Sequence, residues 1–311
     1  MFLSNMITAL TQVVILYIIV ALGFFCHKAG IYTEKASRLT TDLLFYIVTP
    51  AMIIRSFIAI EYSRETLKGL GLAFLAAIIF HLIGIVLSEI FFCKTDTEKA
   101  SIYKFPAVDG NVGYMVLPLA GAMLGDEGVF YCSAIVIPFN ILSFTHGIKV
   151  MTKGTKNSKI SAKDLLLNPG SIGVLVGLPL FLLNVNLPQV AFMPLSYVAD
   201  LQTPLAMIMF GTYLASADLK KVFSDYHVFI CTFLKLIAMP VLTILSLKLL
   251  GFAGTLLVAC SLSASAPTAN NTVMFAAKFD KDTALASSVT ALVSLLSIFT
   301  MPVMVAIAQS I

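Results

Sequence analysis

The chain has 311 residues, of which 59% are hydrophobic and 12% are charged, and its formal net charge is +4. Soluble domains contain about 45–50% apolar and about 25% charged residues, so this composition excludes an ordinary soluble protein. The positive charges are not clustered with aromatic residues on a polar segment, which argues against a nucleic-acid partner. The five cysteines are scattered and form no CxxC pair, so we expect no disulfide framework, no metal site and no cofactor.

Ten apolar segments, each bounded by charge, glycine or proline, predict ten transmembrane helices. A backbone polar group without a partner is costly in lipid, so only helices or a closed barrel can cross a membrane. The segments are apolar over about 20 residues without the alternation of barrel strands, which favours helices. The first has no basic region before it and no cleavage site after it, which indicates a retained span. The predicted spans are about 8–26, 36–57, 67–93, 104–123, 128–148, 165–183, 194–215, 226–250, 254–277 and 284–308.

The distribution of Lys and Arg predicts the orientation of these spans, because short cytoplasmic loops carry an excess of both residues. Fifteen of the 20 lie at one set of alternate loops, four lie at the other set, and Lys235 lies inside a span. The richer set includes the polar linker 151–164. We therefore expect a multi-pass protein of the plasma or bacterial inner membrane, with both termini outside and this linker in the cytoplasm.

The two halves of the chain, 1–150 and 165–311, align without gaps at one constant offset. This offset places Gly23 opposite Gly177 and superimposes the first five predicted spans on the last five. Because five is odd, the second half must be inverted relative to the first. Chance matching between apolar segments is the alternative. Other matched pairs are Thr49 with Thr203, Asp126 with Asp280, and His81 with Lys235.

Two predicted spans, 104–123 and 254–277, contain helix-breaking and polar residues near their middle. Interrupted helices at corresponding positions of two repeats are typical of a transporter's binding site. A half-helix presents free N–H groups at its N-terminus, where anions bind, and free carbonyls at its C-terminus. Alternatively, small residues only permit close packing and proline only kinks the helix. The residues concerned are Gly110, Asn111, Gly113 and Pro118 in the first span and Pro267, Thr268, Asn270 and Asn271 in the second.

Ionisable and polar residues deep in other spans extend the candidate site. Lys235 and His81 lie well inside their spans, where a charge costs about 2.5–3.5 kcal/mol, so such residues usually serve function or pair internally. A snorkelling lysine, or a histidine bonded to a backbone carbonyl, is the structural alternative. Asn140 lines a pathway or faces a neighbouring helix. Asp109 is expected within about two turns of a span end.

Several segments resemble one known family. GNVGYMVLPLAGAMLGDEG resembles the signature of the auxin efflux carrier family, which includes plant carriers and bacterial malate-permease-like relatives, and APTANNTVMFAAKFDKD is similar to its ninth span. The resemblance implies ten spans in two inverted repeats, with broken spans 4 and 9 crossing near mid-membrane. It also implies an elevator-like motion of spans 3–5 and 8–10 against a scaffold of spans 1, 2, 6 and 7. Site roles for Asn111, Pro118 and Pro267 follow from the resemblance, whereas Thr272 stands where plant carriers tend to have a second proline.

The sequence thus predicts an all-α integral membrane transporter of a small organic anion, a mono- or dicarboxylate. Asn111, Thr268, Asn270 and Asn271 would hold the carboxylate, while Lys235 and His81 would neutralise it. The alternative is a cation/proton antiporter or a sodium-coupled symporter on a related crossed-helix fold; a sensor is disfavoured because no soluble domain is apparent. No span carries a His-Glu metal motif or a nucleophile with a base, so we expect no enzyme. The expected partners are the anion and the lipid bilayer, and a homodimer is left open.

Overall fold

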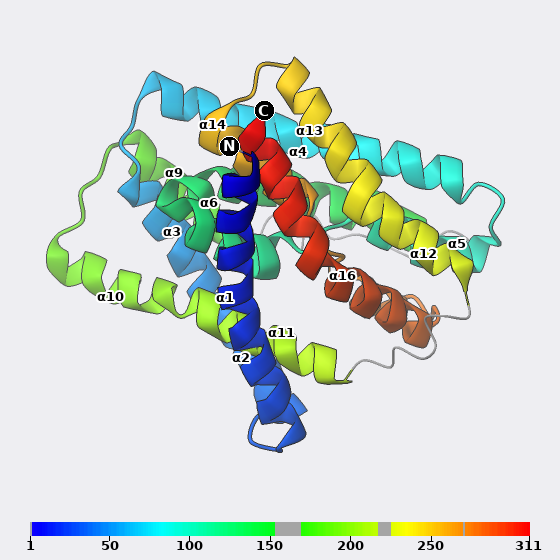
Figure 1. Cartoon of the computed structure of the whole chain (residues 1–311). Coiled ribbons are helices and arrows are strands. Elements are labelled where there is room, and N and C mark those ends of the chain that lie inside the picture. Colours follow the sequence, from blue (N-terminus) through cyan, green and yellow to red (C-terminus); the bar gives the residue numbers. More distant parts are fainter. Residues whose placement is uncertain (1, 153–168, 217–224, 270) are drawn as a thin grey trace.

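The computed structural model describes residues 2–152, 169–216, 225–269 and 271–311 (Figure 1). Linker 151–164, apart from its first two residues, and Asn270 lie outside the described residues. Every regular element of the described chain is helical, which confirms the all-α class. The elements of the first half are α1 (Phe2–Lys28), α2 (Glu34–Leu43), η1 (Leu44–Val48), α3 (Thr49–Ala59), α4 (Arg64–Phe91), α5 (Thr97–Val108), η2 (Val112–Val116), α6 (Leu117–Leu142), η3 (Ser143–Gly147) and α7 (Ile148–Met151).

The second half continues the helical architecture. Its elements are α9 (Pro169–Leu182), α10 (Gln189–Asp200), α11 (Gln202–Ser216), α12 (Tyr226–Phe233), η5 (Leu234–Ala238), α13 (Met239–Leu249), α14 (Gly254–Ala264), α15 (Asn271–Lys278) and α16 (Thr283–Ser310). Among the described residues, five helical stretches are long and apolar enough to cross a membrane, so a multi-pass protein is supported while the count of ten spans stays a prediction. These stretches are Lys35–Ala59, Arg64–Phe91, Leu117–Met151, Tyr226–Leu249 and Thr283–Ser310.

Three π-helical turns stand in front of prolines. The turns η1, η2 and η5 each end two residues before a proline, namely Pro50, Pro118 and Pro240. Proline lacks an N–H and its ring collides with the preceding turn, and a widened turn accommodates both defects without ending the helix. Pro118 is therefore the second residue of α6, after the interruption of span 4 rather than within it.

The helices can be described as two groups, which also pack extensively against each other. In the first, which we call the α1 group, α1 packs on α11, α3 packs on α9 and α10, and α2 packs on α11. In the second, the α4 group, α4 packs on α5, α6 and α13, while α14 packs on α6 and α16. The groups meet where α1 lies along α16 and where α3 lies against α6 (Figure 1).

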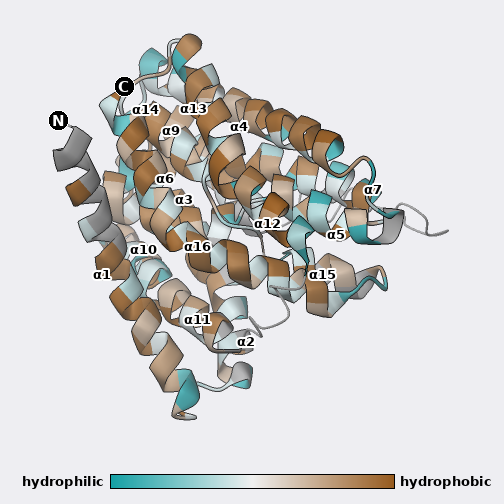
Figure 2. Cartoon of the chain, turned by 45° about the vertical axis from the view of Figure 1, so that its right-hand side comes forward, coloured by the Kyte–Doolittle hydropathy of each residue, from teal (hydrophilic) through white to brown (hydrophobic). Residues whose placement is uncertain are grey.

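The outer faces of the bundle are apolar. Large apolar side chains are exposed along α1, α4, α13 and α16, and Figure 2 shows α4 and α13 as largely hydrophobic. Such faces would be costly in water and suit contact with lipid chains. Examples are Ile18, Leu22, Leu82, Val86, Leu242, Leu245 and Phe299.

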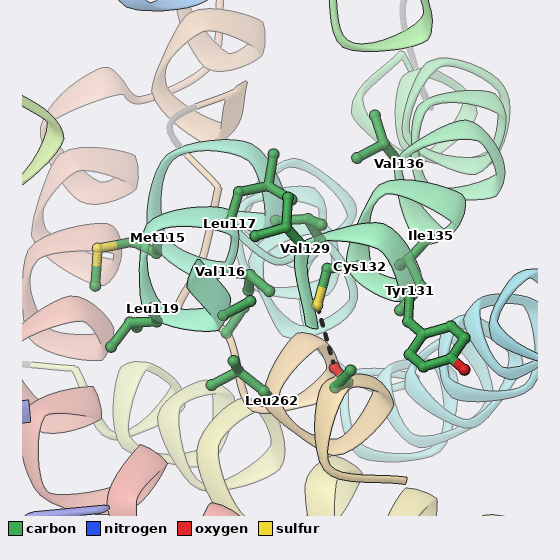
Figure 3. Close-up of a cluster of buried hydrophobic side chains, with 14 of the residues drawn as sticks. Met115, Val116, Leu117, Leu119, Val129, Tyr131, Cys132, Ile135, Val136 and Leu262 are labelled. Atoms are coloured by element: carbon green, nitrogen blue, oxygen red, sulfur yellow. Dashed lines mark hydrogen bonds between the residues drawn. The ribbon is translucent and has the colours of Figure 1, made fainter. Parts of the chain in front are cut away.

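A buried contact between α6 and α14 supports the centre of the α4 group. Val129, Cys132 and Leu262 are buried there, in the hydrophobic cluster drawn in Figure 3. The Cys132 thiol donates a hydrogen bond to the Ala259 carbonyl over 3.6 Å, shown as the dashed line. This contact fixes α14 against α6 next to the place where both interrupted spans change direction.

Candidate substrate-binding site

The segment that follows α5 pairs through its backbone with the segment that follows α14. Helix α5 ends at Val108 and α14 ends at Ala264. The Asn111 N–H donates to the Pro267 carbonyl over 2.7 Å, and the Ala269 N–H donates to the Asp109 carbonyl over 3.2 Å. Gly110 and Thr268 form an antiparallel bridge between these bonds. The backbone groups freed by the helix breaks thus satisfy one another, and we call residues 109–111 and 265–269 the crossover.

Side chains complete the C-terminal end of α5. The Thr268 hydroxyl donates to the Pro106 carbonyl over 3.0 Å, and the Lys235 ammonium group donates to the Val108 carbonyl over 3.0 Å. Lys235 is completely buried. A cation at the C-terminus of a helix balances the negative end of its dipole. Lys235, which the sequence places inside a span, therefore caps the half-helix α5 in the structure.

The helical segments that follow the crossover, η2 and α15, present their N-termini to it, and a helix N-terminus favours an anion. The turn η2 begins at Val112, directly after Asn111, and α15 begins at Asn271. The first N–H groups of a helix have no partner within it and favour anions through the helix dipole. Here the Val112 and Thr272 N–H groups donate to the carbonyls of Gly110 and Ala269, so the dipole and the later N–H groups of each first turn remain for a ligand. Gly113 is partly exposed, and a Cβ added to it would meet no heavy atom within 4 Å, so the backbone there is open to a ligand.

Close packing at the crossover requires Gly110. A Cβ added to this residue would lie 3.1 Å from the Lys235 nitrogen and 3.2 Å from the Ala266 Cβ. Any side chain would therefore push Lys235 away from the α5 terminus.

We expect Thr268→Val to lower the free energy of unfolding by about 1–3 kcal/mol, because it leaves the buried Pro106 carbonyl without the donor that replaces the helical N–H. Thermal unfolding of the purified protein measures this effect. The matched control is Thr300→Val on α16, where the hydroxyl bonds a carbonyl within its own helix over 3.4 Å, and this variant should unfold close to the wild type. Equal losses in both variants would contradict a special role for Thr268.

The hydrogen bonds of His81 and Asn140 go to groups outside the crossover. The His81 ring, completely buried in α4, has its Nδ1 2.7 Å from the Ala77 carbonyl and stacks on Phe80. Its Nε2 has no hydrogen-bond partner in the described part of the chain. The Asn140 side-chain amide donates to the Ser171 hydroxyl on α9 over 3.4 Å, so it links the two helix groups instead of facing the crossover.

Asp109 is more deeply buried than its predicted place within about two turns of a span end implies. Helix α5 begins at Thr97 rather than near 104, and within it the Lys104 ammonium pairs with the Glu89 carboxylate at 2.6 Å. Asp109 consequently follows twelve helical residues and is 1% exposed at the crossover. Its position directly before the Gly110-Asn111 break was the sequence signal that could have located it.

A second polar cluster lies away from the crossover, where the two helix groups meet. The Arg55 guanidinium on α3 pairs with Asp200 at 2.5 Å and with Asp126 at 3.3 Å. Asp126 follows Gly125, whose φ of 65° divides α6 with a conformation that favours glycine. These three residues line a cavity of about 310 Å³. Its net negative charge disfavours an anion, and among the described residues no group of three or more His, Cys, Asp or Glu side chains could hold a metal ion.

Comparison with known proteins places this architecture in a family. A family model described as "Membrane transport protein" matches residues 8–305. An uncharacterized transporter of Methanocaldococcus jannaschii is 25% identical over 286 residues, which cover 89% of this chain and 91% of the relative. A Rhizobium meliloti protein named "Putative malonate transporter" is 23% identical over 295 residues, which cover 91% and 90% of the two chains.

The family and both relatives are transporters, which confirms the prediction that the chain is a membrane transporter and not an enzyme. The match covers nearly the whole chain, including both sides of the crossover. The chain therefore belongs to the membrane transport protein family, the family of auxin efflux carriers that its sequence resembles.

Proposed function

We propose that the chain is a secondary transporter of a small organic anion, a mono- or dicarboxylate, that binds at the crossover. The observation that carries this proposal is the pairing of two interrupted spans beside the buried cation Lys235. Two half-helix N-termini and one ammonium group supply positive potential without lipid-exposed charge, which is what a carboxylate needs at this depth. The name of the Rhizobium meliloti relative supports a dicarboxylate such as malonate.

In this proposal the residues near the crossover have three roles: they bind the anion, maintain the helix break and balance the charge. Asn111 and Asn271, at the starts of η2 and α15, hold the carboxylate together with backbone N–H groups, and Gly113 leaves room for it. Pro267 and Thr268 maintain the break that exposes these groups. Lys235 supplies the balancing charge, and His81, which interacts with it electrostatically, tunes that charge. Asn270 also holds the carboxylate, as proposed from the sequence.

The order of the elements supports two inverted repeats, 1–150 and 165–311. Each half opens with one helix, α1 or α9, and continues with a helical stretch that carries a Thr-Pro pair, after the π-helical turn η1 in the first half and after the turn at Leu201 in the second. A third helical segment follows, then a helix that ends at the crossover, α5 or α14. Each half then closes with a helix entered through a left-handed residue, Gly125 in α6 and Asp280 before α16.

The two helix groups support an elevator-type motion. The crossover lies entirely within the α4 group, so this group can carry the anion while the α1 group stays fixed in the membrane. We also propose that both termini lie outside and that linker 151–164 is cytoplasmic, on the distribution of Lys and Arg. A homodimer remains a prediction from the sequence.

A cation carrier is the second candidate, and the buried carboxyl of Asp109 is the observation that favours it. A cation would bind at the C-terminal carbonyls of a half-helix. At α5 that position is already taken by the ammonium group of Lys235, which disfavours this candidate.

Uptake into liposomes that contain the purified protein tests the proposal. We expect accumulation of labelled malonate or a related carboxylate by counterflow, without a requirement for sodium. Counterflow of sodium ions or a sodium-driven flux, with no carboxylate transported, would favour the second candidate instead.

The ion pair between Arg55 and Asp126 gives a test of the elevator motion, because it joins α3 of one helix group to α6 of the other. We expect Asp126→Asn to raise the counterflow rate about 1.5- to 5-fold, since an exposed ion pair stabilises one state by about 0.2–1 kcal/mol. The control Asp200→Asn removes the pair within the α1 group and should leave the rate unchanged. A rate that rises equally in both variants would contradict the motion proposed here.

A further inference from the structure

We infer that Asp109 carries a coupling proton, so that one proton enters the crossover with each anion bound. This inference rests on the proposed function and adds its coupling ion.

The carboxyl group of Asp109 is buried without a complete set of hydrogen bonds. It is 1% exposed, and its Oδ1 has no hydrogen-bond partner among the described residues. Its Oδ2 lies against η3, where a Cβ added to Gly147 would come within 3.5 Å of it. Buried polar groups are nearly always bonded, so an orphaned carboxyl oxygen at the crossover indicates a functional constraint.

Lys235 is near Asp109 but is bonded elsewhere. Its ammonium group donates to the carbonyl of Val108, the residue before Asp109, and the two side chains interact electrostatically. Because Asp109 and Lys235 are not bonded to each other, the carboxylate of a bound anion can replace Asp109 as the counterion of Lys235.

Charge balance links this exchange to a proton. A buried cation is strongly destabilised without a counterion. When Asp109 is ionised it balances Lys235, and an incoming anion must compete with it. When Asp109 is protonated, Lys235 lacks a counterion and the anion supplies one.

The proton step is a simple transfer. A proton from water on one side of the membrane forms an O–H bond at the Asp109 carboxyl as the anion binds. The same O–H bond breaks on the other side, and the proton returns to water as the anion leaves and the carboxylate again balances Lys235. One proton thus crosses with each anion.

The other side chains near Asp109 and Lys235 are not the proposed proton carrier. Ser143 of η3 faces Asp109 but does not ionise, and Cys231 of α12 lies near Lys235. His81 of α4 interacts with Lys235 and with His146 of η3. The Asp109 variants separate any contribution of the histidines from that of the carboxyl.

The test measures malonate binding and proton uptake together. Purified wild-type protein is titrated with malonate by calorimetry in a range of pH where malonate stays ionised, and a pH indicator in weak buffer counts the protons taken up. We expect one proton per malonate and an affinity that weakens about tenfold per pH unit once Asp109 is ionised. Asp109→Asn should bind malonate with no proton uptake and little pH dependence, and in liposomes it should exchange malonate without accumulating it against a pH gradient.

Two further variants complete the design. Asp42→Asn removes an exposed carboxylate on α2 and should behave as the wild type. Asp109→Glu should keep proton uptake with a shifted pH dependence. This result tests the carboxyl at position 109 as the proton carrier even if Asp109→Asn fails to fold. Proton uptake that persists in folded Asp109→Asn, or malonate binding to the wild type without any proton uptake, would overturn the inference. A wild type that binds neither malonate nor any other carboxylate would instead overturn the proposed function.

Discussion

Lys235→Met lowers malonate uptake into liposomes by a factor of about 30 to several thousand. Removing one member of a buried, hydrogen-bonded charge pair costs about 2–5 kcal/mol, much of it from the partner left unpaired. Here the substitution removes the cation from the C-terminus of α5, leaves Asp109 without its electrostatic partner and withdraws the counter-charge of the anion. Initial uptake rates, corrected for the amount of protein inserted, measure the loss.

The control for this variant is Lys248→Met, which removes an exposed ammonium group at the end of the neighbouring helix α13. Its uptake should match the wild type. If Lys235→Met transported malonate at the wild-type rate, the proposed role of this cation would be wrong. If it merely unfolded, its thermal transition would be lost as well, so both variants are compared by unfolding first.

Gly211→Ala prevents the close crossing of α1 and α11 and lowers the free energy of unfolding by about 3 kcal/mol. The added Cβ would lie 2.0 Å from the Val20 carbonyl oxygen and 2.7 Å from the Phe24 nitrogen. Both are backbone atoms, so no side chain can move to make room. Gly23 fits the same crossing from α1, since its added Cβ would lie 2.2 Å from the Ile208 carbonyl oxygen. Small residues allow helices in a membrane to approach in this way.

The matched control is Gly71→Ala on α4, where an added Cβ meets no heavy atom within 4 Å. Thermal unfolding and the yield of monodisperse protein in detergent should be unchanged in this control and reduced in Gly211→Ala. Equal behaviour of the two variants would show that α1 and α11 do not cross as described.

Much of the fold could be predicted because lipid imposes a strong constraint on the sequence. Long apolar segments must be helical, and the glycine, proline and asparagine residues at 110–111 and 267–268 disclose where two of these helices are interrupted. Asn111 and Pro267 do meet in the structure, as expected if corresponding breaks of two repeats converge.

Contacts between distant residues could not be predicted in the same way. The burial of Asp109 depends on segments distant in the chain, such as η3, where Gly147 lies close to its carboxyl group. Likewise, the sequence around Arg55 and around Asn140 does not indicate which residue on another helix each of them contacts. Such contacts are set by tertiary packing, which periodicity and composition do not encode.

The most direct test of the proposed binding site is to locate a bound carboxylate. Crystals of the protein grown with bromomalonate would show the bromine by its anomalous scattering. We expect one anomalous peak beside Asn111, between the start of η2 and the start of α15 and within reach of Lys235. A peak in the cavity at Arg55, with none at the crossover, would contradict it.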